Sequence, residues 1–295
     1  MTSELIAVDW GTSRFRAFRL DAGRKVLDRV SADDGMSTVP AGGFAAVLER
    51  HCGAWMKASP EAPVLMAGMV GARNGWAEAA YAACPASPKS LAESMLKVTE
   101  RVSIVPGVIA RDKSGPDVMR GEETLIFGTE VSNGLVCLPG THSKWARVEN
   151  GAITDFATFM TGETYALYRQ HSLLSRLAAE PEDLTGFDDG LESAKDETGL
   201  TNRLFQARTR VLAGDMPGEK VWPYLSGLLI GAEIEGAFKR YGDHLVTLVA
   251  DGVLAQRYVA ALRARGAAIE IISPERAFLE GLAAIAAARN QEPTP

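Results

Sequence analysis

A short segment near the N-terminus combines the residue types that hold a nucleotide phosphate and its metal ion. The apolar residues 5–8 end at Asp9, and Gly11, Thr12 and Ser13 follow before a second strand-like run. Glycine and hydroxyl residues in such a turn offer donors to phosphate, while a carboxylate at a strand end can hold hydrated Mg²⁺, which usually takes only one or two protein carboxylates. The pattern indicates a phosphate-binding β-hairpin, although an ordinary polar hairpin has the same composition.

A second segment of this kind lies near the middle of the chain. Apolar residues 135–138 lead into a turn that contains Gly140, Thr141, His142 and Ser143. Serine-hydrolase chemistry is a poor alternative here, because adjacent strand residues point to opposite faces and no GxSxG sequence surrounds Ser143. Two phosphate-type turns in two α/β halves predict a nucleotide held in a cleft between two lobes.

Strand and helix patterns alternate along the chain, which is typical of an α/β fold. Residues 180–199 are acidic and poorly periodic, so we expect a surface excursion there. The predicted lobes are residues 1–133, with the first phosphate hairpin and the sugar site, and residues 134–295, with the second hairpin and the adenosine site. The last helix could pack back towards the first lobe. Beyond the two turns, strands are predicted at residues 26–30, 63–66, 102–105, 245–250 and 268–272, and helices at 42–57, 119–130, 163–171, 224–241, 254–265 and 274–288.

Composition narrows the classes of partner. The 295 residues carry a formal net charge of −6, which provides no basic surface for nucleic acid. Cys52, Cys84 and Cys137 are odd in number and far apart, as expected of reduced thiols in a cytoplasmic protein. Neither a signal peptide nor a membrane-spanning segment is predicted, and the P-loop and dinucleotide-binding motifs are absent. We therefore expect a cytoplasmic protein with a small-molecule substrate; a homodimer is compatible with the sequence.

Short motifs follow one another along most of the chain, at residues 7–13, 66–71, 75–76, 117–124, 138–145, 160–163 and 225–233. Taken in this order, they resemble the 2-dehydro-3-deoxygalactonokinase family of the sugar kinase and actin superfamily. This resemblance implies two ribonuclease H-like lobes, each a mixed sheet flanked by helices, in the actin-like ATPase fold. It also implies that ATP, with Mg²⁺, phosphorylates the 6-hydroxyl of 2-dehydro-3-deoxy-D-galactonate in galactonate breakdown. A kinase for another sugar or sugar acid and a non-catalytic sugar-binding regulator are the alternatives.

The resemblance assigns catalytic roles to specific residues. Asp9 is the expected metal-side carboxylate, and Glu122 is the first choice for the base that receives the proton of the attacking hydroxyl. Glu123 and Asp117 are the alternatives, and acidic residues at a helix start also complement the helix dipole without any catalytic role. Arg120 could bind the substrate carboxylate or the transferring phosphate, or form an ion pair with a neighbouring glutamate. The residues expected to face the phosphates are Gly11, Thr12, Ser13 and Arg14, and then Gly140, Thr141, His142 and Ser143.

Two further groups complete the expected site. The substrate group is Gly68, Met69, Gly71, Arg73, Asn74 and Trp76, although a well-packed loop would also explain Trp76. The adenosine group is Gly227, Gly231, Asp251 and Gly252, although glycines four residues apart also permit close helix packing. At Asp251-Gly252 the chain departs from the family pattern, in which we expect a glycine followed by a small hydroxyl residue.

Overall fold

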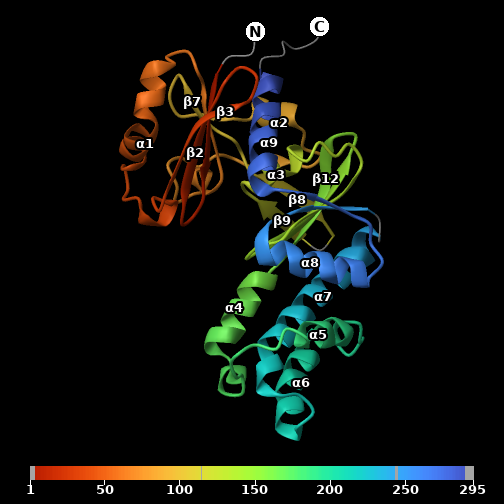
Figure 1. The fold of residues 1–295 in the computed structure, drawn as a ribbon. Helices are drawn as coiled ribbons and strands as arrows, with labels where there is room; N and C mark the ends of the chain where they lie inside the picture. Colours follow the sequence, from red (N-terminus) through yellow and green to blue (C-terminus); the bar gives the residue numbers. More distant parts are fainter. Residues whose placement is uncertain (1–3, 114, 243–244, 290–295) are drawn as a thin grey trace. The chain divides into compact units, whose positions relative to one another are not determined.

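The computed structural model describes residues 4–113, 115–242 and 245–289 of the chain (Figure 1). The chain divides into two compact units. Unit 1 comprises Met1–Asn133, Ala146–Phe156 and Ile272–Pro295, and unit 2 comprises Gly134–Trp145 and Ala157–Ile271. Among the described residues, none of the helices is both long and apolar enough to cross a membrane. The functional division into a sugar-acid lobe and an adenosine lobe stays a prediction.

Unit 1 is built on a six-stranded sheet of order β3-β2-β1-β4-β7-β6. Strand β1 pairs antiparallel with β2 and parallel with β4. Ile6, Val8 and Trp10 alternate along β1 and pack with Phe44 and Leu48 of helix α1 in one apolar core. The strands are β1 Leu5–Trp10, β2 Phe15–Leu20, β3 Val26–Ala32, β4 Val64–Ala67, β6 Leu96–Lys97 and β7 Val102–Ile104, and α1 is Phe44–Ala58.

The C-terminal helix α9, Pro274–Arg289, belongs to unit 1 and contacts β1, β4, helix α2 (Pro88–Glu93) and helix α3 (Glu122–Phe127) (Figure 1). Glycines allow α9 and α3 to approach closely. A Cβ atom on Gly281 would lie 1.8 Å from the Thr124 carbonyl oxygen, and one on Gly128 would lie 1.7 Å from the Ala277 carbonyl oxygen. Helix α3, which carries the predicted base, is therefore fixed by the last helix of the chain.

The segment before α3 differs from the helix predicted at residues 119–130. A small sheet of order β5-β8-β9 precedes α3, formed by Ala82–Ala83, Val108–Asp112 and Gly115–Met119. Gly121 then has a φ of +104°, a conformation that favours glycine and ends any helical path from residue 119. The helix is therefore shorter than predicted and begins at Glu122.

A second sheet has five strands in the order β12-β11-β10-β13-β14; most of it belongs to unit 2, and residues 146–156, which span the end of β11 and much of β12, belong to unit 1. Its strands are β10 Gly134–Leu138, β11 Ser143–Glu149, β12 Ala152–Phe159, β13 Val246–Val249 and β14 Ile269–Ile272. Helices α7, Val221–Tyr241, and α8, Gly252–Ala264, contribute to one apolar core with β10, β11 and β13. Read in chain order, five strands of each sheet follow the same spatial order, third-second-first-fourth-fifth, so the turn after β1 and the turn after β10 occupy equivalent positions in the two sheets.

The remaining helices of unit 2 are α4 Thr161–His171, α5 Gly186–Ala194 and α6 Leu200–Ala213. The prediction of a surface excursion at residues 180–199 is wrong, because α5 packs along α7. Glycines make this contact: a Cβ atom on Gly190 would lie 2.1 Å from the Tyr224 carbonyl oxygen. Phe187 and Leu191 of α5 also pack against the apolar core, but the helix has only nine residues, so its apolar positions are too few for a clear sequence pattern.

Candidate active site

Hairpin 1, the turn of residues 11–14 between β1 and β2, presents an open polar surface. The Gly11 N–H donates to the Arg14 carbonyl oxygen at 2.9 Å and closes the turn. Thr12, Ser13 and Arg14 are exposed, as expected of residues that are to meet a ligand. The predicted turn between two strands is confirmed, and its contact with phosphate stays a prediction.

A neighbouring loop, residues 33–38, supports hairpin 1 from one side. The Met36 N–H donates to the Gly11 carbonyl oxygen and the Ser37 N–H to that of Thr12, both at 2.9 Å. A Cβ atom on Gly35 would lie 2.2 Å from the Ser13 carbonyl carbon, so only glycine fits there without movement. Sequence reasoning missed this support, for which the turn-forming Asp33-Asp34-Gly35 sequence is the only local signal.

Asp9 lies in β1 directly opposite Arg16 of β2, and the two form an ion pair through Asp9 Oδ2. The Arg16 Nε donates to the same oxygen at 3.0 Å. The Asp9 side chain is 22% exposed. No group of three or more metal-ligating side chains occurs among the described residues, but Mg²⁺ that arrives with a nucleotide needs only one or two carboxylates. A single, accessible Asp9 fits that requirement, and Arg16 is a neighbour that sequence reasoning missed.

The loops that follow β4 and β9 meet beside Asp9. Gly68 has a φ of +97°, and a Cβ atom there would lie 2.9 Å from the Trp10 carbonyl oxygen and 3.6 Å from Asp9 Oδ1. A Cβ atom on Gly121 would lie 3.2 Å from the Cα atom of Gly68. Unit 1 therefore brings together the predicted metal ligand, the predicted substrate loop and the start of the helix that carries the predicted base.

Arg120 is held by the same surroundings. Its Nη2 donates to the Ala79 carbonyl oxygen at 2.8 Å, and its guanidinium carbon lies 4.5 Å from the centroid of the Tyr81 ring. A Cβ atom on Gly71 would lie 2.9 Å from Arg120 Nη1. The Nε and Nη1 atoms are buried and have no hydrogen-bond partner among the described residues. Buried donors of a charged group are costly to leave unpaired, so this arginine is suited to receive an anion.

The two adjacent glutamates at the start of α3 differ in environment. Glu122 is half-buried, and its Oε2 accepts a hydrogen bond from the Arg120 N–H at 3.0 Å. Glu123 is fully buried and accepts from the Gly121 N–H at 2.7 Å and from the Thr124 hydroxyl at 3.1 Å. Burial, together with the negative charge of Glu122, raises the pKa of Glu123 to about 8. Both carboxylates therefore bind backbone N–H groups at the helix start, and Glu122 is the more accessible one.

The rest of the predicted substrate loop divides into packed and exposed residues. Trp76 lies against the apolar core, with its ring centroid 6.3 Å from those of Trp10 and Phe44. The structure thus supports the packing interpretation of Trp76. Arg73 and Asn74 are exposed, whereas Met69 is half-buried. The polar members of the loop are consequently open to a ligand, although their role in binding stays a prediction.

Hairpin 2, the turn of residues 139–142 between β10 and β11, is supported by the start of α4. A Cβ atom on Gly162 would lie 2.5 Å from the Gly140 carbonyl oxygen, and the Glu163 N–H donates to the Thr141 carbonyl oxygen at 3.0 Å. The His142 imidazole Nε2 lies 2.5 Å from Glu163 Oε2. Thr141 and His142 are exposed. The supporting glycine belongs to the 160–163 motif, which the sequence analysis noted without assigning it a role.

The side chain of Ser143 points away from the turn surface. Ser143 was expected to face the phosphates, but its hydroxyl is fully buried and lies 3.1 Å from the Tyr258 hydroxyl, so any phosphate contact would have to use its backbone and stays a prediction. The physical reason is strand alternation, since Ser143 begins β11 and shares its inward face with Trp145. Lys144, on the opposite face, is 4% exposed and donates from Nζ to the His142 carbonyl oxygen at 2.9 Å. Sequence reasoning did not select this lysine.

The glycines assigned to adenosine have another explanation. A Cβ atom on Gly227 would lie 2.0 Å from the Phe187 carbonyl oxygen, and one on Gly231 would lie 2.6 Å from the Ala194 Cβ atom. Both glycines therefore allow α7 to approach α5, which is the alternative weighed above. Gly231 also lines a cavity of about 210 Å³ with Leu191 and Ile234. Asp251 and Gly252 are exposed at the start of α8. Contact of any of these residues with adenosine stays a prediction.

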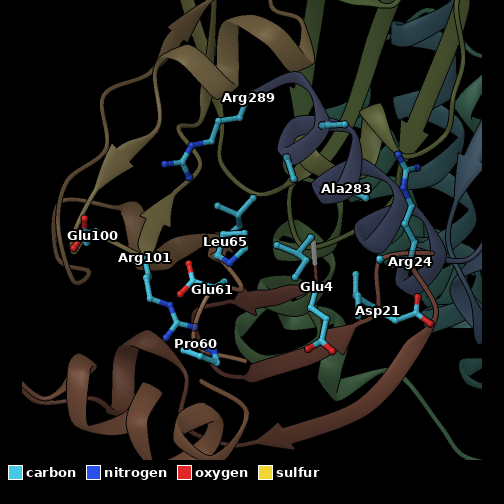
Figure 2. Close-up of a pocket in the computed structure, with 16 residues that line it drawn as sticks. Glu4, Asp21, Arg24, Pro60, Glu61, Leu65, Glu100, Arg101, Ala283 and Arg289 are labelled. Carbon is cyan, nitrogen blue, oxygen red and sulfur yellow. The ribbon is translucent and has the colours of Figure 1, made fainter. Parts of the chain in front are cut away.

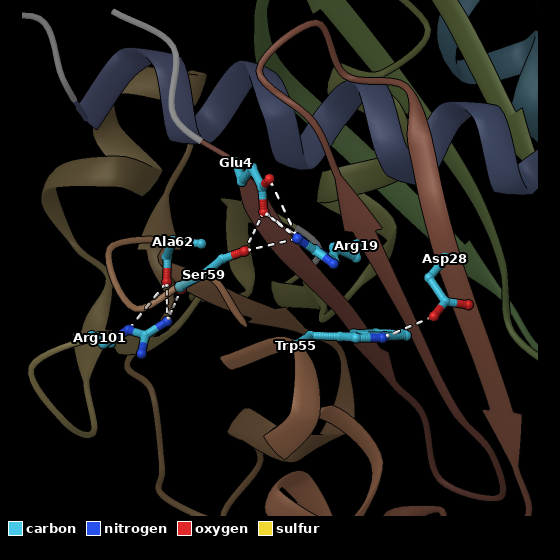
Figure 3. Close-up of polar contacts among 7 residues, drawn as sticks. All are labelled: Glu4, Arg19, Asp28, Trp55, Ser59, Ala62 and Arg101. Atoms are coloured by element: carbon cyan, nitrogen blue, oxygen red, sulfur yellow. Dashed lines mark hydrogen bonds and ion pairs between the residues drawn. The ribbon is translucent and has the colours of Figure 1, made fainter. Parts of the chain in front are cut away.

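A larger cavity, of about 650 Å³, lies at the opposite end of the unit 1 sheet (Figure 2). It opens beside Leu5, so it is roughly 13 Å along β1 from Asp9 at about 3.3 Å per residue. Two of the charged side chains that line it, Glu4 and Arg101, bind other groups of unit 1. Glu4 pairs with Arg19, and Arg101 donates to the carbonyl oxygens of Ser59 and Ala62 (Figure 3). This cavity therefore contains none of the predicted site residues.

Known proteins resemble this chain along nearly its whole length. A model of the family described as 2-keto-3-deoxy-galactonokinase matches residues 9–285. The chain belongs to this family. The 2-dehydro-3-deoxygalactonokinase of Escherichia coli is 36% identical over 291 residues, which cover 97% of this chain and 98% of that protein. A crystal structure assigned to 2-dehydro-3-deoxygalactonokinase from Sinorhizobium meliloti has 36% identity and a TM-score of 0.89, and covers 96% of this chain and 98% of its own.

More distant proteins share the fold of this galactonokinase family member. The activator of the 2-hydroxyisocaproyl-CoA dehydratase from Clostridium difficile, solved with bound ADPNP, has a TM-score of 0.51 at 13% identity and covers 97% of this chain and 96% of its own. Such a likeness shows the fold alone. The predicted α/β fold with two ribonuclease H-like lobes of the actin-like ATPase type is confirmed, as is the family resemblance drawn from the motifs.

Proposed function

We propose that this protein transfers the γ-phosphoryl group of ATP to the 6-hydroxyl of 2-dehydro-3-deoxy-D-galactonate. The product is 2-dehydro-3-deoxy-6-phospho-D-galactonate, an intermediate of galactonate breakdown. The observation that carries the proposal is the family match over residues 9–285, supported by relatives named for this activity at 36–37% identity along nearly their whole length. The proposed setting is the cytoplasm, with a small-molecule substrate as the partner.

The proposed nucleotide site uses the two hairpins. Phosphoryl transfer depends mainly on positioning and charge neutralisation, so the turn N–H groups and hydroxyls of residues 11–14 and 140–142 would surround the β- and γ-phosphates. Asp9 would hold Mg²⁺, which neutralises phosphate charge when bound. Arg16 lies next to this carboxylate and would either hold its orientation or turn towards a phosphate.

The proposed acceptor site lies where Gly68 and Gly121 meet. Glu122 would take the proton of the substrate 6-hydroxyl while the oxygen of that hydroxyl bonds to the γ-phosphorus. The bond between the γ-phosphorus and the oxygen that bridges the β- and γ-phosphates breaks at the same time, and ADP leaves. Glu122 is chosen over Glu123 because the latter is fully buried and both of its oxygens accept hydrogen bonds. The unpartnered guanidinium atoms of Arg120 would receive the substrate carboxylate or the transferring phosphoryl group.

Purified protein with ATP and Mg²⁺ provides the test. ADP release would be measured with 2-dehydro-3-deoxy-D-galactonate, with its gluconate-derived counterpart and with a neutral sugar. We expect the highest kcat/KM with the galactonate-derived acid. Turnover with another acceptor only would assign the chain to a different sugar kinase, and sugar binding without turnover would indicate a regulator.

A further inference from the structure

A buried carboxylate lies beneath hairpin 2. Glu233 of α7 is 2% exposed, and its two oxygens accept hydrogen bonds from different elements of unit 2. The Trp145 Nε1 of β11 donates to Oε1 at 2.8 Å, and the Tyr258 hydroxyl of α8 donates to Oε2 at 2.8 Å. Burial raises the pKa of Glu233, whereas hydrogen bonds from Thr161, Trp145, Tyr258 and Ser143 oppose that effect.

Two of these donors lie next to hairpin 2. Ser143 follows the turn as the first residue of β11, and Thr161 begins α4, the helix whose Gly162 packs against the Gly140 carbonyl oxygen. A buried carboxylate is destabilising unless hydrogen-bond donors satisfy its oxygens. Four donors from three separate elements converge on Glu233, so the arrangement of these elements is tied to this one side chain.

The network also fixes the direction of the Ser143 hydroxyl. Tyr258 has a single hydroxyl hydrogen and donates it to Glu233. While Glu233 is ionised, Ser143 is therefore the donor at its 3.1 Å contact with Tyr258, or else gives its hydrogen to Glu233 itself. Either way its hydrogen points inward, and its oxygen lone pairs face the Gly140 N–H, 3.4 Å away.

We propose that Glu233 is a positioning residue for nucleotide binding, which sets the conformation of hairpin 2 through Ser143, Thr161 and Tyr258. This inference rests on the proposed function only in that hairpin 2 contacts the nucleotide phosphates. Glu233 itself touches no ligand. Its effect reaches the nucleotide through the backbone of residues 140–142 and through the start of α4.

The test compares two tyrosine variants. Tyr258→Phe removes the hydroxyl that joins Glu233 to Ser143. Tyr224→Phe removes an equally buried hydroxyl of unit 2, which donates to Ser193 at 2.8 Å and has no part in this network. Tyr258→Phe removes two buried hydrogen bonds, to Glu233 and to Ser143, and Tyr224→Phe removes one, so we expect both variants to lose Tm and Tyr258→Phe to lose more. We expect only Tyr258→Phe to weaken ADP binding, by about three- to tenfold in Kd, measured by calorimetry.

Glu233→Gln is the second variant. Its amide nitrogen cannot accept a hydrogen bond, so a donor of the network loses its partner, and we expect a higher KM for ATP with little change in KM for the sugar acid. A double variant with Tyr258→Phe should be non-additive.

The outcomes separate the two proposals. If the Tyr258→Phe variant folds and binds ADP as tightly as an active wild-type enzyme does, the positioning role of Glu233 alone is overturned. Weakened ADP binding in that variant, with a wild type that phosphorylates no sugar acid, would overturn the proposed acceptor and keep the positioning role. A wild type that does not bind ADP would overturn both.

Discussion

At the scale of single residues, the site in unit 1 depends on carboxylates whose neighbours differ. Asp9 is accessible and paired with an arginine, Glu122 is half-buried, and Glu123 is fully buried. These environments fit three separate proposed roles: metal binding for Asp9, proton acceptance for Glu122 and support of the loop before α3 for Glu123. The sequence shows three acidic residues, whereas only the structure separates them by burial.

Asp9→Asn tests the metal role. The amide keeps the shape of the side chain and removes its charge, so we expect kcat to fall by about a hundredfold or more, as when a charge-stabilising group is lost. The matched control is Glu4→Gln, because Glu4 lies just before β1 and pairs with Arg19 of β2, at the far end of these two strands from Asp9. That variant should keep wild-type turnover. Equal kcat values for Asp9→Asn and wild type in the ADP-release assay would remove Asp9 from the mechanism.

The buried Glu123 predicts a pH dependence of stability. Its pKa is raised to about 8 from 4.5, so between these values the folded state holds a proton that the unfolded state has lost. The free energy of unfolding should therefore fall as pH rises through this window, by up to about 1.4 kcal/mol per pH unit. Urea unfolding of Glu123→Gln at pH 5.5 and 7.5 should lack this contribution. Glu130→Gln, at an exposed position just beyond α3, should retain it; identical slopes in all three proteins would contradict the assignment.

At the scale of elements, each hairpin is held by a glycine from a neighbouring segment. Gly35 supports hairpin 1 and Gly162 supports hairpin 2, each where a Cβ atom would meet backbone at 2.2–2.5 Å. Backbone cannot give way as a flexible side chain does, so the turn conformation depends on these two positions. Support of this kind comes from residues outside the turn itself.

Gly35→Ala should displace hairpin 1 and raise KM for ATP several-fold. Its control is Gly23→Ala, in the turn between β2 and β3, where the nearest atom to a new Cβ is 3.2 Å away, in the Asp21 side chain. That variant should bind nucleotide as the wild type does. If both variants had the wild-type KM for ATP, the 33–38 loop would have no part in shaping the hairpin.

Gly227→Ala distinguishes helix packing from adenosine binding. The new Cβ atom would meet the Phe187 carbonyl oxygen at 2.0 Å, so we expect a loss of about 1–3 kcal/mol in the free energy of unfolding. In Gly236→Ala on the same helix, the Cβ atom meets only the Phe159 ring at 3.0 Å, and the better helix propensity of alanine offsets part of any cost. A Gly227→Ala protein of normal stability that binds ADP weakly would favour the adenosine role instead.

At the scale of the whole molecule, two sheets repeat one strand order, and each has a glycine-containing turn after its first strand. The turn after each first strand follows from sequence, because a strand, a turn and a returning strand are local patterns, and an apolar pattern likewise predicted α9 as a helix. The strand order and the packing of α5 on α7 do not follow, because they depend on contacts between segments far apart in the chain. The Glu233 network also joins distant residues, whereas the Asp9–Arg16 pair spans only seven positions and depends on the register of β1 and β2.

The most direct test of the account is a crystal structure with a non-hydrolysable ATP analogue, Mg²⁺ and 2-dehydro-3-deoxy-D-galactonate. We expect residues 11–14 and 140–142 to contact the same triphosphate, with the metal at Asp9 and the 6-hydroxyl of the sugar acid beside Glu122. A nucleotide bound elsewhere, for example in the cavity beside Leu5, or a triphosphate in contact with one hairpin only, would contradict the account.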